Sequence, residues 1–484
     1  KLGKNWVGAT VNLENNSEKL KTTNTFSALS QRFLEYGAFV GRGDSTKVFV
    51  ELGFLQRQND SLQNNRIERV NHSNSYYLKS QLIKTEKSNL SVFLNYRTLK
   101  YEDSSLKNEP SLNSRILYSD RYFGQLIQTT TAYETSSGTI AQQEFTYLQV
   151  EPGQGVYMWN DYNGNGIQEL QEFEIAPYSD LAIYVRVFLP NQVFVRTHQN
   201  KFSQALNLNF NQWQNETGFK KFASHFYNQT SFLIERRIRR DGSNFDLNPF
   251  SKNDDELIGL NTNFRNSLFF NRGKQYHSTT YSFLINESQN LINVQFDGNQ
   301  NLASLESISA KNQSHQLQYQ HLVKKSWLFN FSGSTTSTES TSENYPNRNF
   351  EIESYQVEPK IGYLFSKNAS WDIFYEFQQK ENQIGAFETL KQTRLGTSFT
   401  FNSEKGFSMN GEFSMYNNSY EGNALSAVGF QMLEGLQPGK NQTWRLLLQK
   451  NLTQYLDVNI NYQGRNSETS KTIHTGNIQL RAFF

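Results

Sequence analysis

The second half of the chain repeatedly alternates apolar and polar side chains with a period of two residues. In the clearest stretch, 456–462, four apolar residues (Leu456, Val458, Ile460 and Tyr462) alternate with Asp457, Asn459 and Asn461. Successive side chains of a β-strand point to opposite faces of its sheet, so this pattern predicts strands with one apolar and one polar face. Stretches 206–211 and 316–323 alternate in the same way. Such strands have one face suited to lipid and another suited to water.

The composition indicates a protein that crosses a membrane with strands. The 484 residues include 38 Phe and 25 Tyr but only 4 Met, and the mean hydropathy is −0.69. No stretch approaches the roughly 18 consecutive apolar residues of a transmembrane helix. Outer-membrane barrels combine a polar interior, an apolar lipid face and aromatic residues at both interfaces. We therefore predict an all-β fold, an antiparallel transmembrane β-barrel located in the bacterial outer membrane.

Three regions are expected along the chain. Residues 201–484 should supply about fourteen barrel strands, at roughly twenty residues for each strand and turn. Residues 1–150 also read as antiparallel strands, among them 124–134 and 139–150, but stretches such as 80–87 place charge on both faces. We interpret them as a sheet outside the membrane, with further barrel strands as the alternative. Residues 151–200 would form the junction.

The tight turns give a check on this strand count. Turns near Lys324, Lys367 and Glu404 fall at one end of the predicted strands, whereas the turn near Asn451 falls at the other end. Short turns of outer-membrane barrels cluster on the periplasmic side. The mismatch indicates that the count is wrong by one strand between Gly406 and Leu452.

The strongest local motif is a calcium-type loop from Asp161 to Glu172. Oxygen-bearing side chains and one glycine, Gly166, follow the spacing of an EF-hand loop. The predicted calcium ligands are Asp161, Asn163, Asn165, the carbonyl of Ile167, Glu169 (directly or through water) and bidentate Glu172. No helical pattern precedes Asp161, so the expected role of Ca²⁺ is structural, at the junction of sheet and barrel. The alternative is an Asn/Gly-rich turn held by its own Asx hydrogen bonds.

Charge and motif content exclude several other classes of protein. A formal net charge of +2 gives no sign of a nucleic-acid partner, and the absence of cysteine excludes disulfides and thiolate sites. No Gly-x-Ser-x-Gly, phosphate-loop or dinucleotide motif is present. His315 and His321 share one strand face but lie about 20 Å apart along it, too far to hold one metal. We expect no catalytic residues and no enzyme.

Residues Arg236 to Arg240 form a basic cluster at the end of a predicted strand. Arginines suit lipid phosphates or an acidic partner. The alternative, which the sequence supports equally, is that these arginines lie at a strand end exposed to solvent. The sequence leaves both open.

The last predicted strand, residues 472–484, ends the chain on an aromatic side chain. Its apolar face comprises Gly476, Ile478, Leu480, Ala482 and Phe484. This terminus resembles the C-terminal assembly signal of bacterial outer-membrane barrels, with Phe484 as the main point of likeness.

Two segments resemble large outer-membrane proteins of Bacteroidota. The first, residues 155–174, reads GVYMWNDYNGNGIQELQEFE and contains the calcium-type loop. The second is the ending, with MLEGLQPGKN at 432–441, YQGR at 462–465 and HTG at 474–476. The resemblance implies a long β-rich chain that finishes in a barrel, with more β structure before Lys1. It also implies a partner-dependent role in outer-membrane assembly or secretion, and it supplies no catalytic residues.

These observations lead to one main expectation of function. We expect a non-enzymatic outer-membrane barrel that acts as a structural or accessory subunit of an envelope complex, for protein assembly or secretion. Its expected partners are outer-membrane lipids and lipopolysaccharide, together with protein subunits of that complex. The alternatives are a porin or substrate channel, an outer-membrane lipid hydrolase, and a soluble all-β adhesin.

Overall fold

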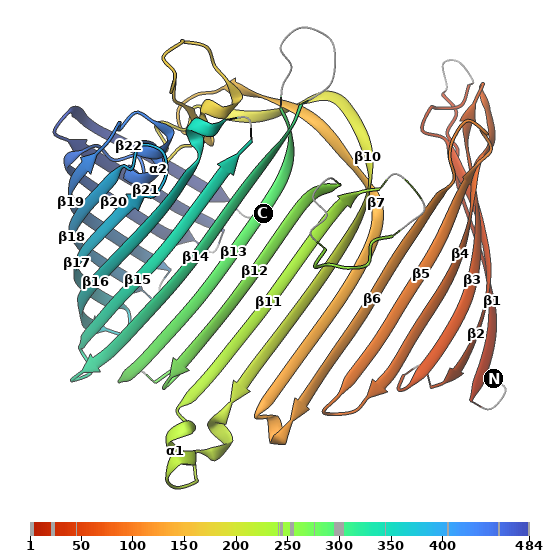
Figure 1. The fold of residues 1–484 in the computed structure, drawn as a ribbon, viewed down its shortest axis with the longest axis horizontal. Coiled ribbons are helices and arrows are strands. Elements are labelled where there is room, and N and C mark those ends of the chain that lie inside the picture. Colours follow the sequence, from red (N-terminus) through yellow and green to blue (C-terminus); the bar gives the residue numbers. More distant parts are fainter. Residues whose placement is uncertain are drawn as a thin grey trace. The chain divides into compact units, whose positions relative to one another are not determined.

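The structure is a computed structural model that describes residues 4–20, 25–44, 46–240, 242, 245–251, 256–274, 276–294, 304–343, 345–403, 406–453 and 455–482. The chain consists mainly of long strands, drawn as arrows in Figure 1. It divides into two compact units. Unit 1 comprises Lys1–Ala141, Phe194–Asn209 and Thr230–Thr262, and unit 2 comprises Gln142–Val193, Phe210–Gln229 and Asn263–Phe484. In the described ranges, no helix has the length and apolar character needed to cross a membrane. Phe484, the predicted terminal signal, lies outside the described residues.

Unit 1 contains an antiparallel meander in which each strand pairs with the next one along the chain. Its strands are β1 (Asn5–Asn16), β2 (Gln31–Gly43), β3 (Phe49–Gln63), β4 (Arg66–Lys84), β5 (Asn89–Tyr101), β6 (Glu109–Tyr122) and the first part of β7 (Ile127–Gln149). The sequence predicted separate strands at 124–134 and 139–150, but the structure has the single strand β7. Ser137 explains the difference, because its hydroxyl donates to the carbonyl of Leu112 on β6 and keeps the Ser-Gly stretch extended.

Unit 2 is built on a second antiparallel meander. Its strands are β13 (His277–Val294), β14 (Ser304–Val323), β15 (Trp327–Ser342), β16 (Phe350–Ser366), β17 (Ala369–Asn382), β18 (Thr389–Ser403), β19 (Phe407–Glu421), β20 (Gly439–Thr453), β21 (Leu456–Ser467) and β22 (Ser470–Ala482). The short strands β8 (Tyr157–Trp159) and β9 (Phe173–Ile175) also belong to this unit. Strands β10 (Tyr184–Asn209), β11 (Phe226–Arg239) and β12 (Leu257–Phe270) contribute residues to both units, as β7 does.

The helices are short and lie in connections between strands. They are α1 (Phe219–Ala223) and α2 (Ala427–Leu433), with single 3-10 turns η1 (Phe123–Gln125), η2 (Leu170–Glu172), η3 (Phe210–Trp213) and η4 (Pro346–Arg348). Helix α2 begins at Ser426, whose hydroxyl accepts the backbone N–H of Gly429 at 3.0 Å. It packs through Met432 and Leu433 onto Leu390 of β18, in the small apolar cluster of unit 2.

The connections of unit 2 differ in length at the two ends of its strands. Strand pairs β14/β15, β16/β17, β18/β19 and β20/β21 are joined at one end by only two or three residues. At the opposite end, the β15/β16, β17/β18 and β19/β20 connections have six to seventeen residues, and the β21/β22 turn is short. The turn near Asn451 therefore lies at the same end as those near Lys324 and Lys367. The mismatch in the sequence thus came from a miscount of one strand between Gly406 and Leu452.

The antiparallel all-β fold is confirmed, but the strand number is not. The described residues form twenty-two strands, so the prediction of about fourteen is wrong for the sheet structure as a whole. Twelve of these, β11 to β22, begin after residue 201, and the other ten begin earlier. The estimate concerned residues 201–484 alone, and strands outside that range make up the difference.

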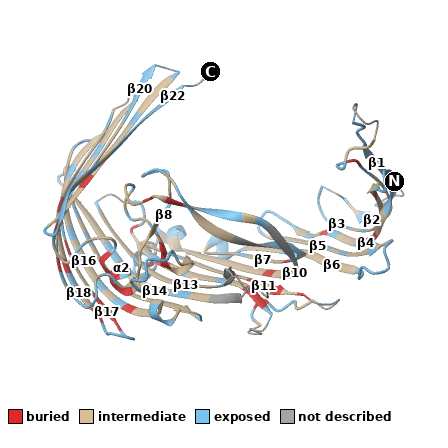
Figure 2. Cartoon of the chain, turned by 90° about the horizontal axis from the view of Figure 1, so that it is seen from above, coloured by how far each residue is buried: buried red, intermediate tan, exposed pale blue. Residues whose placement is uncertain are grey.

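Few residues of the chain are buried (Figure 2), and most of the buried ones are polar. Among the described residues, 22 polar or charged side chains are buried but only 14 hydrophobic ones, whereas apolar residues normally dominate an interior. Strand β17 shows the pattern clearly. Its odd-numbered face carries Ile373 and Tyr375, which are 47% and 45% exposed, while Glu376 and Lys380 on the even-numbered face are buried. One face of the strand is therefore apolar and exposed, and the other is largely polar and buried.

The exposed apolar face continues from strand to strand in unit 2. Register pairs Ile361 of β16 with Ile373 of β17, and Phe413 of β19 with Trp444 of β20. Aromatic side chains gather on it beside the short connections, where the rings of Trp327 and Tyr363 lie 4.9 Å apart. Aromatic girdles of this kind mark the interfaces of outer-membrane strands.

Unit 1 carries the same kind of exposed apolar face. Val7, Val40 and Leu52 are each more than half exposed, and register places Val7 beside Val40 and Val40 beside Leu52. Charged side chains lie on the other face, where the indole of Trp6 donates to Glu51 at 3.1 Å. This pattern favours the alternative interpretation of residues 1–150, in which they supply further membrane strands.

Candidate functional site

A folded stretch of residues 150–183, here called the inner segment, lies against the polar face of β21. Arg465 and Asp180 form a two-pronged ion pair, with Nη2 of Arg465 at 2.6 Å from Oδ2 of Asp180. Beside it, the amide of Gln463 donates to the hydroxyl of Ser179 at 2.7 Å. Gln463 and Arg465 point to the face opposite Tyr462, as the alternation predicted. The predicted polar face thus binds a segment of the same chain.

A second ion pair holds the inner segment to the β15/β16 connection. Arg348 in η4 binds the carboxylate of Glu174 on β9 and donates to the carbonyl of Gln171. Burial raises the pKa of Glu174 above its ordinary value, and Arg348 opposes that rise. The hydroxyl of Tyr162 also donates to Glu174, at 3.3 Å. Because an unpaired buried carboxylate is costly, Arg348 is needed to keep Glu174 ionised there.

The β19/β20 connection makes the third contact with the inner segment. A Cβ added to Gly435 would lie 2.4 Å from Cγ of Pro177, so the two stretches touch and only glycine fits. Gly435 also has a φ of +80°, which glycine adopts without strain. Lys380 of β17 holds this connection by donating to the carbonyl of Met432 at 3.0 Å.

Further along the polar face, charged side chains pair across neighbouring strands. Arg394 of β18 binds Glu376 of β17 at 3.4 Å and Glu412 of β19 at 2.6 Å. Lys360 of β16 binds Asp372 of β17 at 3.3 Å. The charged side chains of this face are therefore compensated by partners on neighbouring strands.

The predicted calcium loop is folded by its own hydrogen bonds. Both carboxylate oxygens of Asp161 accept backbone N–H groups, from Gly164 at 2.7 Å and Gly166 at 2.8 Å. The side-chain oxygen of Asn163 accepts from the backbone of Asn165 at 2.9 Å, and that of Asn165 accepts from Ile167 at 2.7 Å. These are the Asx turns of the alternative interpretation.

The two acidic residues at the end of the loop accept hydrogen bonds from residues at or just before its beginning. The amide of Asn163 donates to Glu169 at 2.8 Å. Glu172 is 1% exposed, and its carboxylate accepts the indole N–H of Trp159 at 2.7 Å and the backbone N–H of Tyr162 at 3.2 Å. Across the described residues, no three His, Cys, Asp or Glu side chains are grouped as a metal site. Hydrogen bonds within the loop therefore account for its fold, and calcium binding there stays a prediction.

The basic cluster is neither a solvated rim nor a row of free arginines. Arg236 is 2% exposed and binds Asp246 through Nη1 at 2.7 Å, within unit 1. Arg240 is also buried, with its guanidinium 5.0 Å from the ring of Phe245. Arg236 and Arg240 therefore lie on a buried face that Ile234 and Ile238 share.

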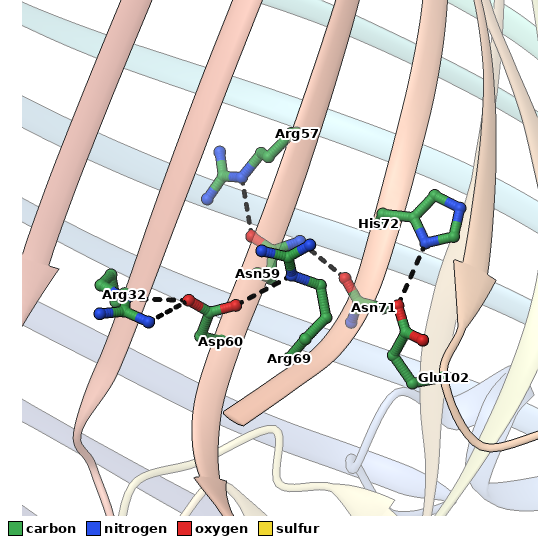
Figure 3. A network of polar contacts seen from close by, with 8 residues as sticks. All are labelled: Arg32, Arg57, Asn59, Asp60, Arg69, Asn71, His72 and Glu102. Carbon is green, nitrogen blue, oxygen red and sulfur yellow. Dashed lines mark hydrogen bonds and ion pairs between the residues drawn. The ribbon is translucent and has the colours of Figure 1, made fainter. Parts of the chain in front are cut away.

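Unit 1 has a second polar network on its own strands (Figure 3). Asp60 of β3 binds Arg32 of β2 at 2.8 Å and Arg69 of β4 at 3.1 Å. Beside it, the amide of Asn59 donates to Asn71 at 2.7 Å. The charge of Asp60 is thus compensated by arginines on both neighbouring strands.

Sequence reasoning missed the residues that anchor the inner segment. No recognised motif contains Arg348, Asp180 or Arg465. Arg465 does fall inside a segment that resembles other outer-membrane proteins. Their partners are 174 and 285 positions away in the sequence. Only pairing between distant segments could have identified them.

Solved structures with a similar fold include proteins named as receptors, as transporters and as an outer membrane protein. No protein-family model and no curated protein matches the sequence. The ferric yersiniabactin uptake receptor FyuA from Yersinia pestis is 8% identical, with 100% of this chain and 76% of that chain covered and a TM-score of 0.38. The copper transporter OprC is 9% identical (95% and 69% covered, TM-score 0.37). The outer membrane transporter YddB from Escherichia coli is 9% identical (94% and 75% covered, TM-score 0.31).

These comparisons correct one prediction and agree with two others. The three proteins are named for uptake or transport, whereas the sequence led us to expect an accessory subunit for assembly or secretion, so that expectation is wrong. The names agree with an outer-membrane location and with a chain that is not an enzyme. At these sequence identities the likeness concerns the fold alone. Evidence for the function must come from the side chains of this chain.

Proposed function

We propose that this protein spans the outer membrane with its strands and provides a passage for small polar solutes along their polar face. The observation that carries the proposal is the inverted burial, with exposed apolar side chains on one face and paired charges on the other. Lipid, including lipopolysaccharide, would contact the exposed face. The sequence-based porin or channel alternative thus becomes the main interpretation.

The inner segment would restrict this passage. It lies at the end of unit 2 where the connections are long, and long loops of outer-membrane barrels face the cell exterior. Ion pairs to Arg348 and Arg465 hold it on the polar face instead of leaving it in bulk water. A segment held in this way narrows the space along the face and so selects solutes by size.

Conductance across planar bilayers tests the proposal. The purified chain should form channels, and Glu174→Gln with Asp180→Asn should raise the conductance per channel because both anchors of the inner segment are weakened. A matched control, Asp457→Asn with Glu421→Gln, removes two carboxylates that make no ion pair with the segment and should leave conductance near the parental value. A protein that folds into bilayers but conducts in neither form would refute the passage.

We also propose that Ca²⁺ binds the loop from Asp161 to Glu172. The donor set fits by chemistry: Asp161, Asn163, Asn165, the Ile167 carbonyl, Glu169 and Glu172 offer the oxygens that calcium prefers. The contact of Asn163 with Glu169 brings both halves of the loop together. The ion would neutralise the carboxylates and stiffen the inner segment. Protein partners in a larger envelope assembly stay a prediction.

A further inference from the structure

Unit 2 contains a cavity of about 370 Å³ beside the inner segment. Its walls come from residues 158–162 and Leu181 of the inner segment, from the β19/β20 connection with α2, and from the ends of β20, β21 and β22. Ligand pockets in proteins commonly span about 300–1,000 Å³. The cavity is thus large enough for a molecule of about disaccharide size.

Most of the cavity wall is apolar. Leu425, Phe430 and Leu436 contribute from the β19/β20 connection, and Ile473 contributes from β22. Leu433 closes the floor, because its side chain is 2% exposed and belongs to the apolar cluster under α2. Such a wall favours a ligand with an apolar surface.

The two charged side chains on the wall are already compensated. Arg465 is bound to Asp180 and lies 4.2 Å from the ring of Tyr178. Asp161 accepts three backbone N–H groups of its own loop, at 2.7, 3.2 and 2.8 Å. A charged ligand would lose its hydration here without gaining an ion pair, which costs several kcal/mol. The cavity therefore selects against charge.

Neutral polar groups on the wall can orient a ligand. The side-chain amide of Gln437 makes no hydrogen bond with any described residue, although its backbone is bound by Asn441. The hydroxyls of Ser467 and Ser470 lie 2.7 Å apart and have capacity for further bonds. Asn160, whose amide donates to Tyr162, lies on the facing side. Amides and hydroxyls around an apolar wall match a ligand that carries the same groups.

We propose that this cavity binds an uncharged small molecule bearing hydroxyl or amide groups on an apolar frame. The proposal rests on the function proposed above and names the class of solute that would be captured at the long-connection end. Its position beside the inner segment places a captured solute directly at the restriction.

Calorimetric titration of the full chain in detergent tests the site. The uncharged probes are maltose and diacetylchitobiose, which carry hydroxyls, and N-acetyl-leucinamide, which carries amides. Lactobionate is a charged probe of disaccharide size. We expect at least one uncharged probe to saturate one site and lactobionate to bind at least tenfold more weakly. The probe that binds distinguishes a sugar-like from a peptide-like ligand.

Two matched variants locate the binding. Leu425 is 79% exposed, so Leu425→Trp should fold normally while its larger ring fills the cavity and weakens binding at least tenfold. Leu452 is 52% exposed at the other end of β20 and does not line the cavity, so Leu452→Trp should not change affinity. Equal effects of both variants, or no binding by any uncharged probe, would overturn this inference. If the protein conducts but binds no probe, only the proposed binding site is refuted. If it binds a probe but does not conduct, the proposed passage is refuted and the protein is a binding protein.

Discussion

Arg465 on β21 and Asp180 in the inner segment form a bidentate ion pair, in which Nη2 of Arg465 lies 2.6 Å from Oδ2 of Asp180. The two side chains are 17% and 19% exposed, so water screens the pair only in part. Charge-assisted pairs of this geometry are the strong ones in proteins. The pair thus fixes one end of the inner segment, while Arg348 fixes the middle.

Removing this pair should loosen the inner segment without unfolding the strands. Asp180→Asn keeps the size of the side chain but leaves Arg465 without its counter-charge, at a cost of about 1–3 kcal/mol. Hydrogen exchange of residues 173–184 should accelerate accordingly, while exchange in β16 to β19 stays unchanged. Asp457→Asn, on the same polar face of β21, serves as the control. Uniform acceleration across unit 2 would show that the pair supports the whole sheet instead.

A charged side chain on the apolar face of β17 should destabilise the protein when it is in lipid. Ile373→Arg places a guanidinium on the 47% exposed face, where a charge near the bilayer midplane costs about 2–4 kcal/mol. Gln378→Arg, on the polar face of the same strand, should cost much less. Urea unfolding in lipid vesicles measures both variants. If Gln378→Arg is as destabilising as Ile373→Arg, the outward face does not meet lipid.

Alkaline pH should release the inner segment. Burial raises the pKa of Tyr178 to about 12, and burial together with the charge of Glu174 raises the pKa of Tyr162. Unfolded tyrosine ionises near pH 10. The stability from keeping these phenols neutral is therefore complete below about pH 10 and is lost as pH rises towards 12.

Tryptophan fluorescence reports this transition, because Trp159 lies in the inner segment and is bound to Glu172. Tyr178→Phe removes the ionisable group and keeps the ring, so its transition should shift to higher pH. A transition that is identical in the variant would assign the effect to other groups.

Calcium should raise the melting temperature of the protein. Asp161→Ala with Glu172→Ala should abolish any calcium-dependent stabilisation, because both ends of the loop lose their carboxylates. Asp161→Asn is the milder test, since it keeps an acceptor for the N–H groups of Gly164 and Gly166 but removes the charge. If a chelator leaves the melting curve of the parental protein unchanged, the loop is an Asx-bonded turn only.

The face of each strand could be read from the sequence because alternation is local. Val458 and Ile460 were assigned to one face and Asn459 and Asn461 to the other, and register places Ile460 beside the exposed Ile478. The stretch from Asp161 to Glu172 could also be singled out, since its spacing lies within twelve consecutive residues, and its calcium stays a prediction. Strand bounds were misjudged where a local signal misled, as at Ser137, whose Ser-Gly neighbourhood stays extended and bonds to β6.

The sequence by itself thus determined an antiparallel all-β chain with an oily and a polar face, because a period of two needs no knowledge of distant residues. Only the tertiary structure decided what the polar face holds. Arg465 meets Asp180, and Arg348 meets Glu174, across 285 and 174 positions. Which residues meet at that distance depends on strand register and on the lengths of the connections, and the cavity beside the inner segment arises from the same long-range packing.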